Sequence, residues 1–216
     1  MALEYTLETP RAASLGLIVL ETDETLENEA RGAVPPEASL HHTRIYSAPI
    51  VTPETLAAMA ADLPQVATTF PGHVTYDAIA YCCTSGATVI GQDKVAAAIH
   101  SAHPGAKTTD PITAVMAALE ALGAKRIGLL TPYTLDVSGA MQALLEANGF
   151  QIAAFGAFEE AEEAKVARIS EASTLAAMLE VGGGDVDAVF ASCTNLNTFG
   201  VIEAAERALG KPVLSS

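Results

Sequence analysis

Two cysteines of this 216-residue chain lie in matching sequence contexts. The stretch 77–85 reads Asp-Ala-Ile-Ala-Tyr-Cys-Cys-Thr-Ser, and the stretch 187–195 reads Asp-Ala-Val-Phe-Ala-Ser-Cys-Thr-Asn. Cys193 follows Cys83 at an offset of 110 residues (193 − 83), which is also the offset between the two aspartates. A thiolate is both a nucleophile and a base, and it needs no metal. Two thiols on opposite sides of a carbon centre could remove a proton from one face and supply one to the other.

The alternative for each cysteine is a buried core residue, because free cysteine is among the most buried residue types. For a single cysteine we would favour that interpretation. Two matched Cys-Thr turns, at Cys83-Thr84 and Cys193-Thr194, favour a functional role instead. Cys82 directly precedes Cys83 and should point to the opposite face of a strand, so we expect it in the core.

Short apolar runs that alternate with helical patterns predict the elements that position these turns. The expected strands are 15–20, 39–46, 76–82, 107–109, 126–130, 151–155, 186–191 and 212–214. The expected helices are 54–61, 63–70, 91–101, 111–122, 138–147, 174–181 and 201–209. This alternation predicts an α/β protein with parallel sheets. The offset divides it into two similar halves, 1–110 and 111–216, with helix 111–122 able to pack across the boundary.

Each Cys-Thr turn then falls at the carboxyl end of a strand, where open parallel sheets place their ligands. The side chains of Thr84, Ser85, Thr194 and Asn195, with backbone N–H groups, could hold a carboxylate and stabilise an enolate. We expect no metal site, because none of the five histidines has convergent partners. The charged stretch 159–165 is expected to be a solvated loop or helix start.

Composition excludes several classes of protein. The chain has 11 basic and 26 acidic residues and a net charge of −15, which disfavours nucleic acid and anionic membranes as partners. Half of the residues are hydrophobic, too many for a disordered chain. No apolar run approaches the roughly 20 residues of a membrane helix. Three cysteines without disulfide spacing and no signal peptide predict a soluble cytoplasmic protein.

Five stretches together resemble a known superfamily. They are Gly-Leu-Ile-Val-Leu-Glu-Thr-Asp-Glu-Thr at 16–25, Cys-Thr-Ser-Gly at 83–86, Thr-Pro-Tyr at 131–133, Ser-Cys-Thr-Asn at 192–195 and Lys-Pro-Val-Leu-Ser-Ser at 211–216. The chain resembles the aspartate/glutamate racemase superfamily, in its branch of maleate cis-trans isomerase and arylmalonate decarboxylase. Stretches 20–25 and 83–86 look most like the ectoine-utilisation A-type proteins of this branch.

The resemblance implies two pseudo-symmetric Rossmann-like (flavodoxin-like) halves, with a cofactor-free active site between them. Cys83 would attack a substrate double bond, and Cys193 would serve as acid or base. Tyr133 would contact a substrate carboxylate. The decarboxylases lack the first cysteine, so the resemblance predicts a cofactor-independent isomerase or racemase of a small carboxylate. Ala-rich helix faces allow packing between subunits, and we expect a homo-oligomer, either a dimer or a tetramer.

Two acidic residues depart from the isomerase pattern. The isomerases carry Asn at the position of Asp23 and another Asn near Glu163. Because two extra carboxylates repel a dianion, a substrate with an amino or amide group, or with one carboxylate, fits better than maleate. From the residues alone, Thr22 and Asp23 could cap the first helix, or cap it and also contact the ligand.

Two other functions stay open at this stage. One is a non-catalytic protein of ectoine utilisation that binds a small metabolite, and the other is a malonate-type decarboxylase. The second half also lacks a helix after its last strand, whereas the first half has one. We therefore expect a further helix after Ser216 in the natural protein.

Overall fold

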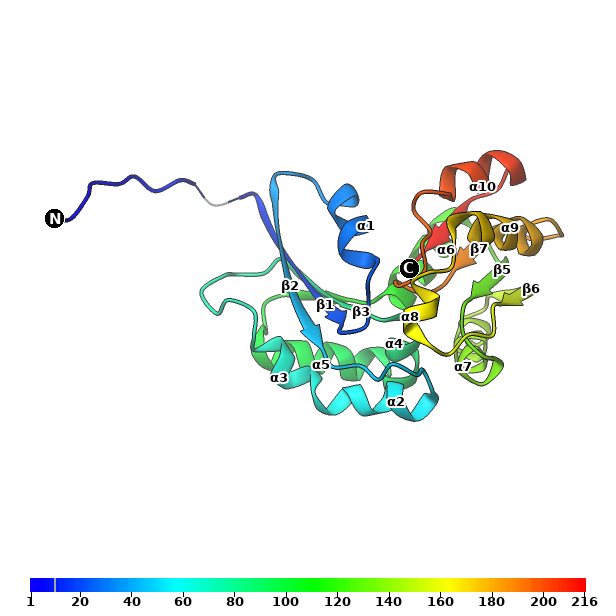
Figure 1. The fold of residues 1–216 in the computed structure, drawn as a ribbon, viewed down its shortest axis with the longest axis horizontal. Coiled ribbons are helices and arrows are strands. Elements are labelled where there is room, and N and C mark those ends of the chain that lie inside the picture. Colours follow the sequence, from blue (N-terminus) through cyan, green and yellow to red (C-terminus); the bar gives the residue numbers. More distant parts are fainter. Residues whose placement is uncertain (10) are drawn as a thin grey trace.

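Two parallel four-stranded sheets form the framework of the computed structural model, which describes residues 1–9 and 11–216 (Figure 1). The first sheet has the order β2-β1-β3-β4, and the second has the equivalent order β6-β5-β7-β8. All strand pairs within the two sheets are parallel. The predicted α/β fold with two similar halves is confirmed. The strands are β1 (Ala13–Leu20), β2 (Ala38–Ile45), β3 (Ala78–Cys82), β4 (Lys107–Thr109), β5 (Arg126–Thr131), β6 (Gln151–Ala157), β7 (Ala188–Ala191) and β8 (Val213–Ser215).

Helices cover both faces of each sheet. In the first half α1 lies on one face, and α2, α3 and α5 lie on the other (Figure 1). In the second half α9 packs on β5, β6 and β7, and α7 packs on β6. The helices are α1 (Leu26–Ala33), α2 (Pro53–Ala58), α3 (Leu63–Ala67), α4 (Thr84–Ile90), α5 (Gln92–Ala102), α6 (Pro111–Leu122), α7 (Leu135–Ala147), α8 (Glu163–Val166), α9 (Glu171–Gly182) and α10 (Ile202–Leu209), with a 3₁₀ turn at Met59–Ala61.

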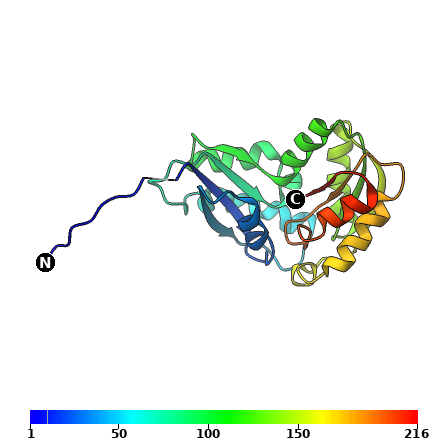
Figure 2. The ribbon, with the colours of Figure 1, turned by 90° about the horizontal axis from the view of Figure 1, so that it is seen from above.

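One hydrophobic cluster runs through both halves. It joins Ile18 and Ile79 of the first sheet to Leu129 and Phe190 of the second, and all four side chains are fully buried. Strands of parallel sheets are covered on both faces, which explains why they read as short continuous apolar runs. Helix α6 contacts both α4 and β8, so it bridges the halves (Figure 2).

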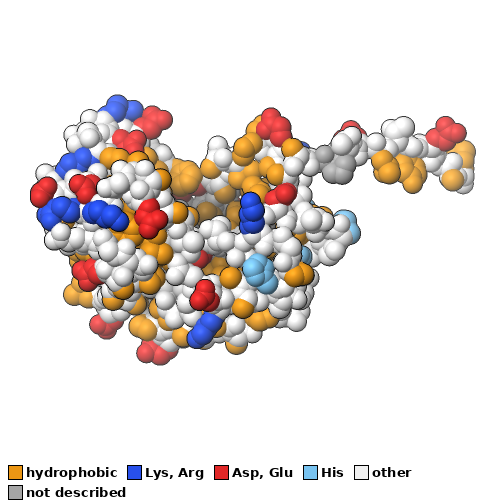
Figure 3. All heavy atoms as spheres, turned by 180° about the vertical axis from the view of Figure 1, so that it is seen from behind, with side chains coloured by type: hydrophobic (Ala, Val, Ile, Leu, Met, Phe, Trp, Pro, Cys, Tyr) orange, Lys and Arg blue, Asp and Glu red, His pale blue; other side chains and the backbone are white. Residues whose placement is uncertain are grey.

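The charged groups lie mostly outside this core. Figure 3 shows acidic side chains spread over the face in view rather than gathered into one patch, and the surface there is hollowed between the two halves. No helix in the described part of the chain is both long and apolar enough to cross a membrane.

One local prediction was wrong, and two were right in part. The helices expected at 54–61 and 63–70 are present, but the first ends in a 3₁₀ turn and the second, α3, ends at Ala67. Helix α4 begins at Thr84, directly after Cys83, whereas the first helix after that cysteine was expected at 91–101. Its Gly and β-branched residues have low helix propensity, so tertiary burial stabilises it. The charged stretch 159–165 does contain a helix start, that of α8, but it is not wholly solvated, because Glu163 turns inward and is 2% exposed.

Alanine substitutions at two glycines, one in β5 and one in α7, test the packing of the second half. A Cβ at Gly128 in β5 would collide with the carbonyl oxygen of Val181, which is backbone and cannot move aside. We expect Gly128→Ala to lower the free energy of unfolding by about 1–3 kcal/mol. Gly139 is exposed in α7 with open space around it. We expect Gly139→Ala to raise the free energy by about 0.5–1 kcal/mol. Urea denaturation measures both, and equal effects would contradict the assigned packing.

Candidate active site

Cys83 lies where β3 passes into α4. It is the N-cap residue of that helix, and its Sγ accepts a hydrogen bond from the backbone N–H of Gly86 at 3.2 Å. A Cβ at position 86 would come within 2.9 Å of this sulfur, so only glycine fits there. The residue is 5% exposed. Burial raises the pKa of the Cys83 thiol from 9.0 to about 12, although the Gly86 N–H and the Tyr81 hydroxyl act in the opposite direction.

Cys193 occupies the matching place after β7. Its φ of 113° is in the region that favours glycine, which costs a non-glycine residue of order 1–3 kcal/mol. Its Sγ lies 3.1 Å from the Tyr133 hydroxyl and accepts from the backbone N–H of Asn195 at 3.3 Å. Burial raises the pKa of this thiol, and the charge of Glu163 raises it further. Strain at a buried reactive side chain favours a functional role for Cys193 over a simple core role.

A single hydroxyl group joins the two cysteine turns. Ser216 Oγ accepts a hydrogen bond from Thr84 Oγ1 at 2.7 Å and another from the backbone N–H of Cys193 at 3.1 Å. The turns therefore face each other across the junction of the two halves. The Tyr133 hydroxyl contacts both Glu163 Oε1 and Cys193 Sγ. Burial raises the pKa of Cys83 and Cys193, and the charge of Glu163 raises both further.

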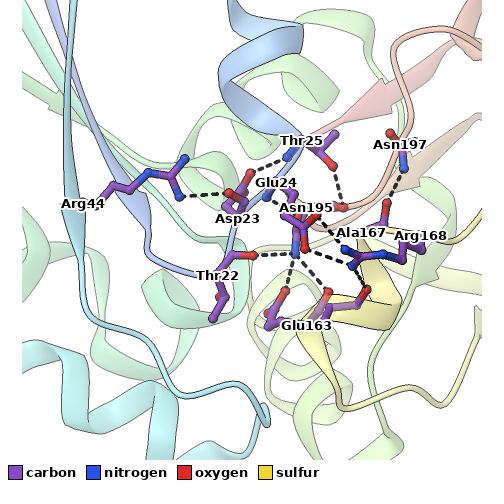
Figure 4. Close-up of polar contacts among 11 residues, drawn as sticks. Thr22, Asp23, Glu24, Thr25, Arg44, Glu163, Ala167, Arg168, Asn195 and Asn197 are labelled. Carbon is purple, nitrogen blue, oxygen red and sulfur yellow. Dashed lines mark hydrogen bonds and ion pairs between the residues drawn. The ribbon is translucent and has the colours of Figure 1, made fainter.

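Glu163 is held by two residues of the second half. The Tyr133 hydroxyl donates to its Oε1 at 2.7 Å. The Asn195 side-chain amide donates to its Oε2 at 2.7 Å (Figure 4). Burial raises the pKa of Glu163, while the hydrogen bonds from Asn195 and Tyr133 lower it in part. The charge of Asp23 raises this pKa further.

Asp23 caps the start of α1 and also reaches into the second half. Its Oδ1 accepts from the backbone N–H groups of Thr25 at 2.9 Å and Leu26 at 2.8 Å. Its Oδ2 accepts from Thr194 Oγ1 at 2.9 Å. Burial raises the pKa of Asp23, and these three donors lower it in part. Asp23 thus satisfies two N–H groups at the start of α1, although Thr25 is the N-cap residue of that helix and Thr22 does not cap it. Contact with a ligand stays a prediction.

Asn195 makes further contacts with the first half. Its Oδ1 accepts from the backbone N–H of Glu24 at 2.8 Å, and its carbonyl oxygen accepts from Thr25 Oγ1 at 3.0 Å (Figure 4). Thr22 Oγ1 lies 2.9 Å from Ser47 Oγ. Ser85 Oγ is buried and has no hydrogen-bond partner among the residues that the structure describes. Cys82 is buried, as expected, and its Sγ contacts the carbonyl oxygen of Ala80.

A short seam closes the site beside Glu163. Ile50 and Glu162 form an antiparallel bridge. The N–H of Val51 donates to Ala161 at 2.8 Å, and the N–H of Glu163 donates to Pro49 at 3.0 Å. The cavity that Glu163 lines with Ser47 and Met59 has a volume of about 10 Å³, enough for one water molecule.

Three residues of the site were not predicted as candidates: Ser47, Tyr81 and Ser216. Ser47 and Tyr81 reach the site through packing between distant segments, and no local sequence pattern predicts their position there. Ser216 lies in one of the five stretches that carried the family resemblance, so that stretch was the available signal. Glu163 was noted only as a departure from the isomerases. Outside position 10, no three His, Cys, Asp or Glu side chains are grouped so as to hold a metal ion.

Two parallel-sheet halves that bring one thiol each to their junction define the class of this protein. The family model described as arylmalonate decarboxylase matches residues 26–216. The chain belongs to the arylmalonate decarboxylase and maleate isomerase family. It is 31% identical to the maleate isomerase of Nocardia farcinica, covering 94% of this chain and 84% of that protein. It is 25% identical to the maleate isomerase of Pseudomonas putida, covering 94% and 86%.

Solved structures show the same fold. The Nocardia farcinica maleate cis-trans isomerase bound to Tris superposes with a TM-score of 0.85 at 31% identity, covering 94% of this chain and 87% of that one. A cysteine-to-serine mutant of that isomerase contains a covalently bound succinylcysteine intermediate, and its TM-score is 0.85 at 30% identity with the same coverage. A liganded mutant of arylmalonate decarboxylase gives a TM-score of 0.83 at 26% identity, covering 95% and 88%.

The buried carboxyl group of Glu163 makes stability depend on pH. Its pKa is raised above the ordinary 4.5, so the unfolded chain releases this proton at lower pH than the folded protein does. The contribution to stability is therefore fully present below pH 4.5 and is lost as the pH rises through the folded pKa. Glu163→Gln removes this dependence.

We subtract the free energy of unfolding of the wild type from that of Glu163→Gln. We expect this difference to be larger, in favour of the variant, at pH 7 than at pH 5. Urea denaturation at the two pH values measures this difference. Glu162→Gln is the matched control, because the Glu162 side chain is 41% exposed and pairs with Lys165. If Glu163→Gln differs from the wild type by the same free energy of unfolding at both pH values, the buried position of the carboxyl group is contradicted.

Proposed function

We propose that this protein is a cofactor-independent isomerase or racemase that acts on a small carboxylate through Cys83 and Cys193. The observation that carries the proposal is the pair of cysteine turns, one from each half, joined at Ser216 Oγ. The maleate isomerases among the relatives support the isomerase reaction. The succinylcysteine in the Nocardia farcinica mutant supports covalent chemistry at a cysteine.

The isomerisation consists of three steps. The Cys83 thiol releases its proton to water as the site opens for the substrate, and its sulfur adds to one carbon of a cis double bond. The π electrons move onto the neighbouring carboxylate-bearing carbon as an enolate. The former double bond, now single, rotates. The enolate then expels the thiolate, which restores the double bond in the trans geometry. Between addition and elimination, Cys193 supplies a proton to the carbanion and then takes it back. In a racemisation, the two thiols would instead act on opposite faces of one carbon.

The surroundings of Cys83 explain why the thiol reacts only with a bound substrate. Its pKa of about 12 keeps it protonated at neutral pH in the closed site. The backbone N–H groups of Gly86 and Asn195 already point at the two sulfur atoms and stabilise a thiolate once it forms. The free hydroxyl of Ser85 is available to donate to a substrate carboxylate.

Replacement of each cysteine tests the two-thiol mechanism. We expect Cys83→Ala and Cys193→Ala each to lower kcat by about 100- to 10,000-fold, the range of a lost acid–base or nucleophilic group. Cys82→Ala is the matched control and should keep turnover close to that of the wild type, because its side chain lies in the core. The panel of substrates includes maleate, its monoamide, aspartate, hydantoins and ectoine breakdown products. Turnover that survives both active-site replacements would refute the mechanism.

Trapping of the adduct separates the enzyme from a non-catalytic binder. In Cys193→Ser we expect intact-mass spectrometry to show a gain equal to the mass of the bound unsaturated substrate, and peptide mapping to place it on Cys83. The double replacement Cys83→Ala with Cys193→Ser should show no gain. For a saturated substrate, the corresponding signal is solvent deuterium at the α-carbon. A binder would give neither signal, and a decarboxylase would instead release CO₂ from a malonate.

A further inference from the structure

The carboxylate of Glu163 occupies two hydrogen-bond donors that face the thiols. A phenol O–H and a primary amide are both good donors to a carboxylate. Here Tyr133 and Asn195 donate to the two oxygens of Glu163, each at 2.7 Å, and Tyr133 also contacts Cys193 Sγ. The protein thus places its own carboxylate against the pair of donors that a second substrate carboxylate would need.

No cation balances this charge within the described parts of the chain. Arg44 pairs with Glu27. Its guanidinium also donates to the carbonyl oxygen of Asp23 at 2.9 Å, and Arg168 pairs with Glu24 (Figure 4). None of the ion pairs formed by the described residues includes Glu163 or Asp23. A dicarboxylate at this end of the site would meet the buried carboxyl group of Glu163 without a counter-charge, whereas the charge of Arg44 acts on the carboxyl group of Asp23.

The space beside Glu163 is small and is lined mostly by apolar side chains, so Glu163 and two hydroxyl groups, those of Ser47 and Thr55, are its polar groups. The small cavity next to this carboxylate is also lined by Ser47, whose hydroxyl lies 2.9 Å from the hydroxyl of Thr22. Each Glu163 oxygen accepts one protein hydrogen bond and can accept another. An N–H group that entered this space would find a carboxylate oxygen and hydroxyl oxygens within reach.

We infer that Glu163 is a specificity-determining residue that selects a substrate with one carboxylate and, at the opposite end, an N–H donor group such as a primary amide or an ammonium. The inference rests on the proposed function, since it assigns the end of the substrate that lies away from the reacting carboxylate. It adds no chemical step. The Glu163 carboxylate takes the place of a second substrate carboxylate. It accepts hydrogen bonds from the amide or ammonium group that the substrate carries instead.

Three saturated ligands with the same carboxylate-bearing two-carbon chain test this selection without chemistry. Succinate ends in a second carboxylate, succinamate in an amide and β-alanine in an ammonium group. We expect calorimetry at pH 7.5 to show that the wild type binds succinamate or β-alanine at least about tenfold more tightly than succinate. Whichever of the two binds more tightly identifies the donor group.

Glu163→Gln keeps the shape of the side chain and removes its charge. We expect this variant to lose most of the discrimination against succinate, whereas Glu162→Gln, at the neighbouring and partly exposed position, should keep it. Turnover of maleate and of its monoamide is measured on the same proteins. The kcat/KM preference for the monoamide in the wild type should fall about tenfold or more in Glu163→Gln.

Equal or tighter binding of succinate by the wild type would overturn the inference, whatever the variant does. An unchanged preference in a folded Glu163→Gln, with folding checked by thermal melting, would also overturn it, as would binding of none of the three ligands. Selective binding without any turnover would leave the inference standing and refute the proposed isomerase. Turnover that depends on Cys83 but shows no preference between maleate and its monoamide would support the proposed isomerase and refute the inference.

Discussion

The hydrogen bond from Thr194 to Asp23 joins the two halves at the point where their cysteine turns meet. A buried carboxylate costs free energy unless donors satisfy it. Asp23 therefore needs both the N–H groups that begin α1 and the hydroxyl of the opposite half. With Glu24 and Thr25 also bonded to Asn195, one short segment of the first half sets the position of the second-half turn.

The sequence was informative where structure depends on local pattern. Apolar runs predicted all eight strands, and the 110-residue offset predicted that Cys83 and Cys193 lie in equivalent turns of two similar halves. Helix α4 was not predicted, because its Thr, Ser, Gly and Val residues favour other conformations and only burial makes them helical. The inward turn of Glu163 was not predicted either. Within a charged stretch, the position of a single side chain depends on Tyr133 and Asn195, which are distant in the sequence.

Family membership and local chemistry give different kinds of information about this protein. The fold and the identity to maleate isomerases define the framework and the family, and they support the isomerase reaction that we propose. The carboxyl groups of Asp23 and Glu163 lie inside that framework, and they alter the electrostatic potential that a substrate meets. An enzyme can thus keep a cysteine-based reaction while the charge at one end of its site changes the molecules on which it acts.

The seam between residues 49–51 and 161–163 has a consequence for solvent and protons. It consists of few backbone hydrogen bonds and lies directly beside Glu163. When it opens, water reaches the carboxyl group and removes the burial that raises its pKa. The open form therefore holds this proton more weakly than the closed form. By thermodynamic linkage, a rise in pH favours the open form and a fall favours the closed one, so the entrance of the site and its protonation state form a single equilibrium.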